Sequence, residues 1–352
     1  MVRRSRVLSA LALLVAAGAL LLLSSCGNSS HGAKSSSAKA HASAHGYVPY
    51  AVFNVASPHV RAGVTVYGRG QSFQKPGAQD DPPLEPAVFD GPVAAYKAYA
   101  SAQVAPTRAD VARLESALQA NDRAGAKQAW RAAFAHYLRL GGVYLSGDVG
   151  ELDGSIDGLP GGLPGGASNA HFSGFHRIEL GLWSSAQPQR MLPWARRLDA
   201  DLAKLPAALR AVEITPLEYA TRAHEVLEDA QRDLLSGTAV PLSGEGVLGT
   251  KAGLEATEAI FVTLRHTFRR EAQGRVASEA EFANFRRVLS SVAAAHGGRL
   301  PSNFELSSHE RELIDGSLGG VLEALSTVPD ELSTEGVEAV KPIPSSSKGE
   351  SQ

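Results

Sequence analysis

Apolar residues recur every three or four positions over most of the chain from Asp90 onward. That spacing places them on one face of an α-helix. Similar series cover 217–234, 260–268 and 282–292. The clearest series consists of Ala126, Trp130, Phe134, Tyr137, Leu140 and Tyr144. The pattern predicts an all-α fold, and because about 240 helical residues exceed one four-helix bundle, we expect two packed bundles of that type.

Polar residues mark where several helices should begin. Asp90 precedes a Gly-Pro pair, an arrangement typical of a helix N-terminus. Ser278 with Glu281, and Ser307 with Glu310, have the spacing of a capping box. In that motif the serine and the glutamate satisfy the first backbone N–H groups of the helix. The sequence therefore predicts that two late helices begin at these serines.

Outside the helical region the hydrophobic pattern changes. A Ser/Ala/Gly-rich stretch predicts a flexible tether, and β-branched and aromatic residues in partial alternation predict a short extended or β arm that ends in prolines. We expect five segments in this order: a signal peptide at 1–25, the tether at 26–46, the arm at 47–88, the helical domain at 89–330 and a disordered tail at 331–352.

The first residues predict the compartment. Three arginines precede 16 mostly apolar residues from Leu8 to Leu23, which is short for a membrane span and typical of a signal-peptide core. "LSSC", which ends at Cys26, resembles the lipobox of bacterial lipoproteins. We expect cleavage before Cys26 and lipid on its sulfur, which would anchor the protein on the extracytoplasmic face of the cell membrane. An ordinary signal peptide with an incidental cysteine is the alternative.

Composition narrows the chemistry of the folded part. Cys26 is the only cysteine, so disulfides and thiolate sites are excluded and any metal must be held by His, Asp and Glu. Cleavage before Cys26 would remove three arginines and no acidic residue, which leaves a formal charge of −5. Since no cluster of Lys and Arg stands out, we do not expect nucleic-acid binding.

The segment "GFHRIELGLW" carries a polar pair within an apolar run. His176 and Glu179 are three residues apart and share one helix face. Such a pair can bind a metal, act as acid and base, or form a structural hydrogen bond. The segment is not HExxH, because Arg177 stands where that motif has its glutamate and no second histidine follows. A metal-dependent peptidase is therefore the weaker alternative.

Two acidic stretches supply further candidate ligands. Asp153 lies in "GELDGSID", and Glu228 stands four residues after His224. If both carboxylates face His176, they and Glu179 give one nitrogen and three carboxylate ligands, a set that suits iron, Mn²⁺ or Zn²⁺. A buried structural hydrogen bond in a protein without metal is the remaining alternative. Taken singly, the other carboxylates of these stretches are more often solvated surface groups than ligands: Glu151, Asp157, Glu225 and Asp229.

The stretch "GLPGGLPGG" at 158–166 interrupts the helical series. It lacks the Gly-Lys-Ser/Thr ending of a phosphate loop. The simplest interpretation is a loop that only connects two helices. The alternative, which assigns it a function, is a lid beside His176.

Several motifs, in order, resemble the EfeO-type imelysin-like proteins: "AGAKQAWRAAFAHY", "GELDGSIDG", "FSGFHRIELGLW" and "AHEVLEDAQRDLLSG". The resemblance implies a helical component of an iron-uptake system that works beside a membrane permease and a haem-dependent peroxidase. It implies His176 and Glu179 as ligands of Fe²⁺ or Fe³⁺, with Asp153 on the acidic turn and Glu228 on the later helix. Zn²⁺ or Mn²⁺ would be expected to substitute in vitro.

The sequence also departs from that family. Leu138 stands where members often have a glutamate, so we expect water or Glu151 to complete the site, or a lower affinity. Many members carry a cupredoxin domain before the helices, and the 47–88 arm is too short for one.

Overall fold

The computed structural model describes residues 84–144, 147–268 and 272–332. These residues form helices and short connections without a β-strand, which confirms the predicted all-α fold. A 3₁₀ turn, Pro86–Phe89, leads into the first long helix. Cys26, the tether, most of the proposed arm and nearly all of the C-terminal tail lie outside the described residues.

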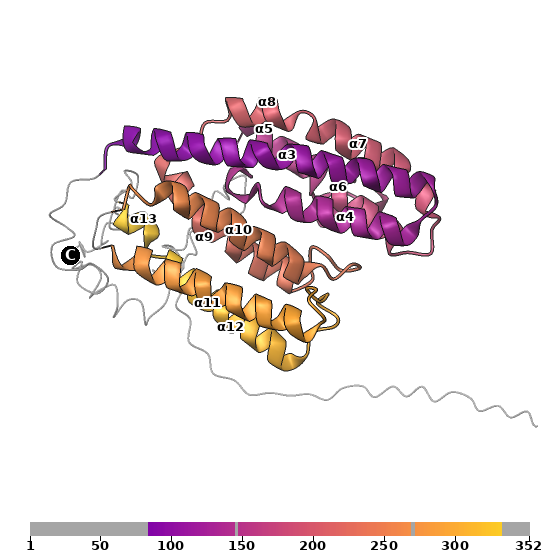
Figure 1. Ribbon diagram of the computed structural model, residues 1–352. Helices are drawn as coiled ribbons and strands as arrows, with labels where there is room; N and C mark the ends of the chain where they lie inside the picture. Colours follow the sequence, from indigo (N-terminus) through magenta and orange to yellow (C-terminus); the bar gives the residue numbers. More distant parts are fainter. Residues whose placement is uncertain (1–83, 145–146, 269–271, 333–352) are drawn as a thin grey trace, which may run out of the picture. The chain divides into compact units, whose positions relative to one another are not determined.

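The first group of helices is built on a long hairpin (Figure 1). Helices α3 (Asp90–Gln119) and α4 (Arg123–Leu138) form this hairpin, and the shorter helices α7 (Leu192–Leu202) and α8 (Leu205–Ala211) pack on α3. Between them in the sequence come α5 (Gly147–Ile156) and α6 (Gly174–Leu182). Helix α6 contacts both α4 and α7.

The second group contains the remaining helices. Helix α9 (Pro216–Asp229) runs on into a π-helical turn, Ala230–Leu235, and packs on α10 (Gly246–Leu264). Helices α11 (Gln273–Ala295) and α12 (Ser308–Leu325) form a second hairpin, followed by the short α13 (Val328–Glu331). Helix α10 also contacts α3 and α4, so it joins the two groups.

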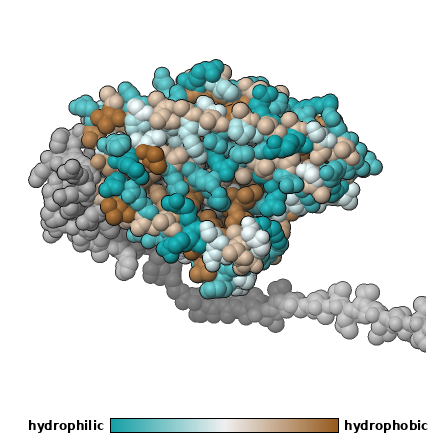
Figure 2. All heavy atoms as spheres, viewed as in Figure 1, coloured by the Kyte–Doolittle hydropathy of each residue, from teal (hydrophilic) through white to brown (hydrophobic). Residues whose placement is uncertain are grey.

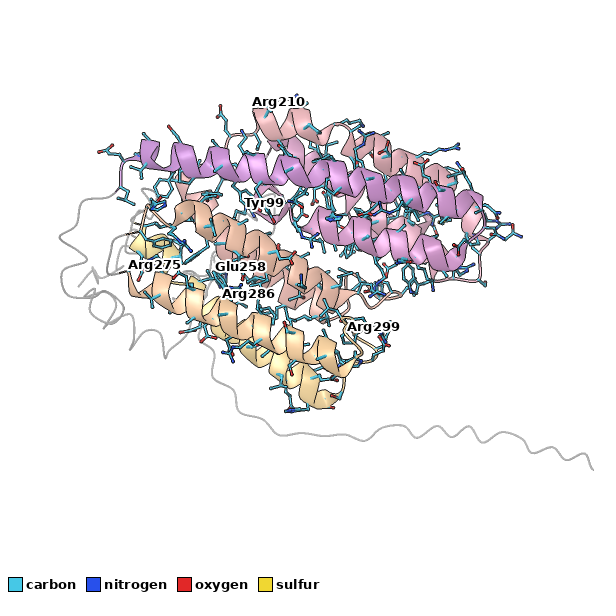
Figure 3. All side chains as sticks on the ribbon, viewed as in Figure 1. Tyr99, Arg210, Glu258, Arg275, Arg286 and Arg299 are labelled. Atoms are coloured by element: carbon cyan, nitrogen blue, oxygen red, sulfur yellow. The ribbon has the colours of Figure 1, made fainter. Side chains whose placement is uncertain are left out.

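The predicted apolar faces form the core. In the predicted series from Ala126 to Tyr144 all members are buried except Tyr144, which is half-buried, and α4 ends at Leu138, before the last two members. Trp130, Phe134 and Tyr137 are among the largest fully buried residues. Hydrophilic side chains cover much of the face seen in Figure 2. Between α10 and α11, Glu258 and Arg286 point toward one another and form a 2.9 Å ion pair (Figure 3).

One of the two predicted capping boxes is correct. Ser307 and Glu310 cap α12 reciprocally, as expected. The prediction for Ser278 is wrong, because α11 begins five residues earlier, at Gln273. Glu331 accepts hydrogen bonds from the backbone N–H groups of Gly274 (2.6 Å) and Arg275 (3.2 Å), so a distant carboxylate caps α11. None of the helices in the described ranges has the length and apolar character needed to cross a membrane.

Candidate metal site

The start of α6 is fixed against the end of α5 by a glycine. Gly174 has φ 73°, and a Cβ atom there would overlap the carbonyl oxygen of Ile156. The hydroxyl of Ser173 donates to the carbonyl of Ser155 at 2.8 Å. Only glycine combines this left-handed backbone with so close an approach. The contact brings the first turn of α6, which carries His176, to the last turn of α5.

Aromatic residues of α4 hold the same turn from the other side. The indole of Trp130 donates from Nε1 to the carbonyl of Phe175 at 3.0 Å. The ring of Phe134 stands edge-on to the imidazole of His176, with 5.9 Å between centroids. Trp130 and Phe134 are four residues apart and so share the helix face that the sequence pattern identified.

The other end of α6 is held by Arg123, the first residue of α4. Its guanidinium donates to the carbonyl oxygens of Leu182, Ser184 (2.8 Å) and Ala186. A cation at a helix C-terminus also stabilises the negative end of the helix dipole. Helix α6 is thus bound by α4 along its length.

The imidazole of His176 lies between two carboxylates. Its Nε2 atom is 3.0 Å from Oδ1 of Asp157, and its Nδ1 atom is 3.6 Å from Oε2 of Glu179. The residue is 4% exposed. Burial alone would lower the pKa of His176, but the charges and hydrogen bonding of Asp157 and Glu179 outweigh it and raise the pKa to about 9. The imidazole therefore carries a proton at neutral pH.

Glu179 is fixed by backbone donors from a distant loop. Its Oε1 atom accepts from the N–H groups of Leu242 (3.2 Å) and Ser243 (2.7 Å), which precede α10. The residue is 1% exposed. Two amide donors stabilise a buried carboxylate that would otherwise be costly.

Asp153 lies one helical turn before Asp157. The hydroxyl of Tyr137 donates to Oδ1 of Asp153 at 2.6 Å. Burial and the negative charge of Asp157, with a smaller contribution from Asp229, raise the pKa of Asp153 to about 7 against the opposing effects of Tyr137 and His176. These acids and His176 therefore belong to one electrostatic cluster.

The structure differs from the sequence-based expectation at two carboxylates, Asp157 and Glu228. The sequence favours a solvated surface position for Asp157, yet this residue contacts His176. Its spacing of four from Asp153 was the available signal, since residues i and i+4 share a face. Glu228 has a side chain that is 45% exposed and pairs at 3.5 Å with Nδ1 of His224. No contact within the described ranges joins Glu228 to His176, whereas the adjacent Asp229 is near enough to affect Asp153.

Glu151, which the sequence offered as a substitute for the missing family glutamate, lies away from the His176 cluster. Glu151 lines a separate cavity of about 440 Å³ together with Asp148 and Lys204. Leu138, at the position of the family glutamate, is buried and lies over Gly249 of α10.

The candidate ligands do not form a finished coordination shell. Within the described ranges, no three His, Asp or Glu side chains lie close enough together to hold a metal ion as they stand. The His176–Asp157 contact is an ion pair whose spacing is also compatible with two ligands of one ion. Nε2 of His176 and Oδ1 of Asp157 are 3.0 Å apart, and within the described ranges this imidazole is the only ion-pair partner of Asp157. Two atoms that each lie about 2.1 Å from a metal at a right angle are about 3 Å apart.

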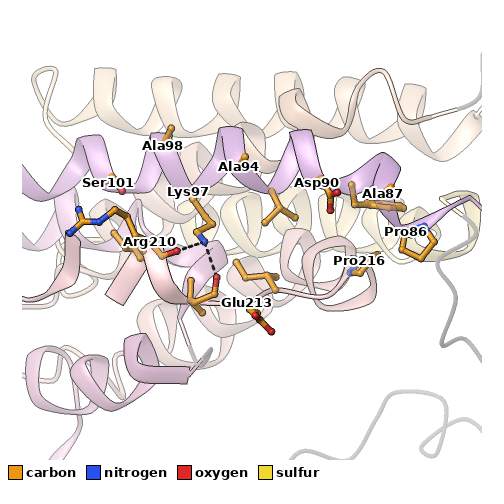
Figure 4. A pocket seen from close by; sticks show the side chains of 15 residues that line it. Pro86, Ala87, Asp90, Ala94, Lys97, Ala98, Ser101, Arg210, Glu213 and Pro216 are labelled. Atoms are coloured by element: carbon orange, nitrogen blue, oxygen red, sulfur yellow. Dashed lines mark hydrogen bonds between the residues drawn. The ribbon is translucent and has the colours of Figure 1, made fainter. Parts of the chain in front are cut away.

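A groove lies elsewhere in the first group of helices. It has a volume of about 790 Å³ and runs between the start of α3 and the end of α8 (Figure 4). Lys97 points across it and donates to the carbonyl oxygens of Arg210 (3.0 Å) and Val212 (2.8 Å). None of the candidate ligands lines this groove.

Comparison with known proteins places the chain in a family. The profile of the imelysin family, whose short name classes it among peptidases, matches residues 92–294. The chain belongs to the imelysin family. All the candidate ligands lie inside the matched region, whereas α12 and α13 lie beyond it.

Individual relatives extend the likeness over most of the chain. The chain is 24% identical over 270 residues to the iron uptake system component EfeO of Escherichia coli K12 and to that of Shigella flexneri, an alignment that covers 75% of this chain and 70% of each relative. It is 24% identical over 267 residues to the protein of the same name from E. coli CFT073. The likeness identifies the chain as an EfeO-type imelysin-like protein.

Proposed function

We propose that this protein takes part in iron uptake as an extracytoplasmic protein that binds Fe²⁺ or Fe³⁺ and passes it to a membrane permease. The observation that carries the proposal is the alignment of three quarters of the chain with iron uptake system components, in a region that contains the His176 cluster. The cluster supplies chemistry that fits such a role.

The proposed ligands begin with His176 and Asp157, and the close contact between these two side chains supports the choice. His176 and Asp157 would bind first. Asp153 lies on α5, which ends one residue before Asp157, and Glu179 lies on α6 with His176. Asp229, which acts on the same carboxylate cluster, is a better candidate for the acidic ligand of α9 than the exposed Glu228. One imidazole and several carboxylates suit iron, with Mn²⁺ or Zn²⁺ as substitutes.

The protons of the cluster give binding its pH dependence. The proton on His176 must leave before Nε2 can bind a metal, and Asp153 must be ionised. Iron would therefore replace protons in a cluster of carboxylates. Because the carboxylates are held by amide and hydroxyl donors rather than by a finished shell, small side-chain movements would admit or release the ion.

Lipid attachment and partners complete the proposal. Cys26 would carry the lipid that keeps the protein at the extracytoplasmic face of the membrane. A membrane permease would receive the iron, and a haem-dependent peroxidase would belong to the same system. Proteins of the relatives' name are components of an iron uptake system, which supports partners of this kind.

Peptidase activity is the second candidate, because the family's short name classes it among peptidases. Arg177 stands where HExxH zinc peptidases have their general base, and its guanidinium lies between the rings of Phe172 (5.9 Å) and Trp194 (5.1 Å). Metal-dependent cleavage of casein by the wild type, lost in Glu179→Ala, would favour the peptidase.

The binding proposal is tested by loading the metal-depleted protein with Fe²⁺ under anaerobic conditions. His176→Ala should abolish stoichiometric binding. Glu228→Gln is the matched control on an exposed acid and should leave binding within about twofold. Equal binding by wild type and His176→Ala would refute the proposal. A loss in Glu228→Gln as large as in His176→Ala would restore Glu228 as a ligand.

A further inference from the structure

The loop before α10, residues 236–245, forms one wall of the candidate site through its backbone. Its amides at Leu242 and Ser243 hold Oε1 of Glu179, as described above. The N–H of Glu245 lies 3.4 Å from the hydroxyl of Ser243, and the carboxylate of Glu245 forms a 3.0 Å ion pair with Arg131 of α4. The position of this loop therefore sets the orientation of Glu179.

The loop is itself fixed by Asn303, which belongs to the connection between α11 and α12. The side-chain amide of Asn303 donates to the carbonyl oxygens of Leu234 (2.8 Å) and Leu235 (3.3 Å), where the loop starts. The backbone N–H of Asn303 donates to the carbonyl oxygen of Gly244 at 2.7 Å, where the loop ends. One residue thus binds both ends of the loop.

Close packing makes this contact specific. Asn303 is buried, and its own carbonyl oxygen accepts from the guanidinium of Arg311 on α12. A Cβ atom at Gly246 would overlap both the carbonyl oxygen of Leu234 and the amide of Asn303. The first residue of α10 is therefore a glycine, because the loop before α10 meets the α11–α12 connection at this point. The two connections lie next to each other in Figure 1.

The side chain of Asn303 also contacts the end of the helical segment that follows Asp229. Leu234 and Leu235 end the π-helical turn that begins directly after Asp229. Asp229 is the acid of the second helical group whose charge acts on Asp153. The side-chain amide of Asn303 therefore fixes the helix end that follows Asp229, and its backbone N–H fixes the far end of the loop that holds Glu179.

We propose that Asn303 is a positioning residue for the metal site, through which the α11–α12 hairpin controls how long the bound metal is retained. The inference rests on the proposed function. Movement of that hairpin, for example when a partner docks, would free the loop at both ends and loosen Glu179. The release of the metal would then be governed by residues that do not touch it.

The test compares two substitutions in the same connection. Asn303→Asp is nearly isosteric but removes the donor and places a carboxylate against two carbonyl oxygens. Ser307→Ala removes the cap of α12 and lies outside the contacts with the loop at 236–245. Each protein is loaded with Fe²⁺ anaerobically, and the rate at which ferrozine removes the metal is measured. Amide hydrogen exchange is followed at Leu242 and Ser243.

We expect Asn303→Asp to release Fe²⁺ about tenfold faster than the wild type, because two buried hydrogen bonds are lost. Exchange at Leu242 and Ser243 should accelerate as well. Ser307→Ala should lower the melting temperature without changing either quantity. A release rate and an exchange pattern in Asn303→Asp equal to those of Ser307→Ala would overturn the inference.

Two further measurements keep the test decisive. If Asn303→Asp does not fold, Asn303→Ser retains the backbone bond to Gly244 and should show the same changes to a smaller extent; unchanged release and exchange in a folded Asn303→Ser would overturn the inference. His176→Ala separates the two proposals. A wild type that binds no more Fe²⁺ than His176→Ala refutes the proposed function, whereas normal wild-type binding with unaltered release in Asn303→Asp refutes only the role of Asn303.

Discussion

The hydroxyl of Tyr137 on α4 donates a 2.6 Å hydrogen bond to Oδ1 of Asp153 on α5. Burial raises the pKa of Tyr137 well above 10, so this residue remains a donor at every physiological pH. A donor of this kind stabilises the ionised form of Asp153, which is the form that can bind a metal. The ring of Tyr137 also packs on Phe175, one residue before His176.

Tyr137→Phe should weaken metal binding without disturbing the core. Loss of the hydroxyl raises the pKa of Asp153 further above about 7, so less of the carboxylate is ionised at pH 7. We expect Mn²⁺ affinity at pH 7 to fall about three- to tenfold and to recover largely at pH 8.5. Calorimetric titration at both pH values measures this. Tyr144→Phe, which loses a bond to a backbone carbonyl instead, should bind as the wild type does. An affinity loss that is the same at both pH values would contradict the explanation.

The stability of the metal-free protein should fall as the pH rises from about 5 to 9. The pKa of Asp153 is raised from 3.8 to about 7, and that of His176 from 6.5 to about 9. The folded state therefore binds more protons than the unfolded state over this range, and raising the pH removes that stabilisation. Melting temperatures at pH 5, 7 and 9 measure the effect. In Asp153→Asn the melting temperature should change less between pH 5 and 7 than in the wild type. A wild type that becomes more stable toward pH 8 would contradict the prediction.

Asp157→Asn should change both metal binding and the titration of His176. The charge of Asp157 raises the pKa of His176, so the substitution should move that pKa downward. Because the substitution also weakens one of the two proposed ligands, we expect Fe²⁺ affinity to fall at least about tenfold. Glu151→Gln, on the separate cavity, is the control. NMR titration of the histidines measures the pKa of His176, and a binding assay measures the Fe²⁺ affinity. If Asp157→Asn gave the same pKa and the same affinity as Glu151→Gln, the assignment of Asp157 would be wrong.

Gly174→Ala should destabilise the protein and misplace His176. A left-handed backbone at a non-glycine residue costs about 1–2 kcal/mol, and the overlap with the carbonyl of Ile156 adds to it. Gly161→Ala is the matched control in the same connection, since its Cβ atom would have no neighbour within 4 Å. Urea denaturation compares the two. Equal stability of both variants would show that the α5–α6 contact can relax.

Local patterns were sufficient to predict most of the fold. The three-to-four spacing of Trp130, Phe134 and Tyr137 predicts a buried helix face, and all three are fully buried. Ser278 shows where local reasoning fails. Its spacing to Glu281 matches that of a true cap, yet Glu331, more than fifty residues away, caps this helix instead. A cap supplied by tertiary contact leaves no signal in the surrounding sequence.

The sequence could predict the side chains that line the site but not the backbone groups that hold them. The shared face of His176 and Glu179 follows from their spacing, and the spacing of Asp153 and Asp157 held the same information. Backbone donors such as the N–H groups of Leu242 and Ser243 exist at every non-proline position, so no residue type marks them. Which acid of "LEDAQ" turns toward Asp153 depends on the rotation of α9, which spacing within the helix does not fix.

The three carbonyl contacts of Arg123 have a consequence for the whole protein. A helix of nine residues is too short to be stable by itself in water, so the geometry of α6 comes from its neighbours. We therefore expect substitutions that weaken the proposed iron site on α4 as well as on α6. Arg123 would be among them, although it reaches only the far end of α6 and touches none of the carboxylates around the imidazole.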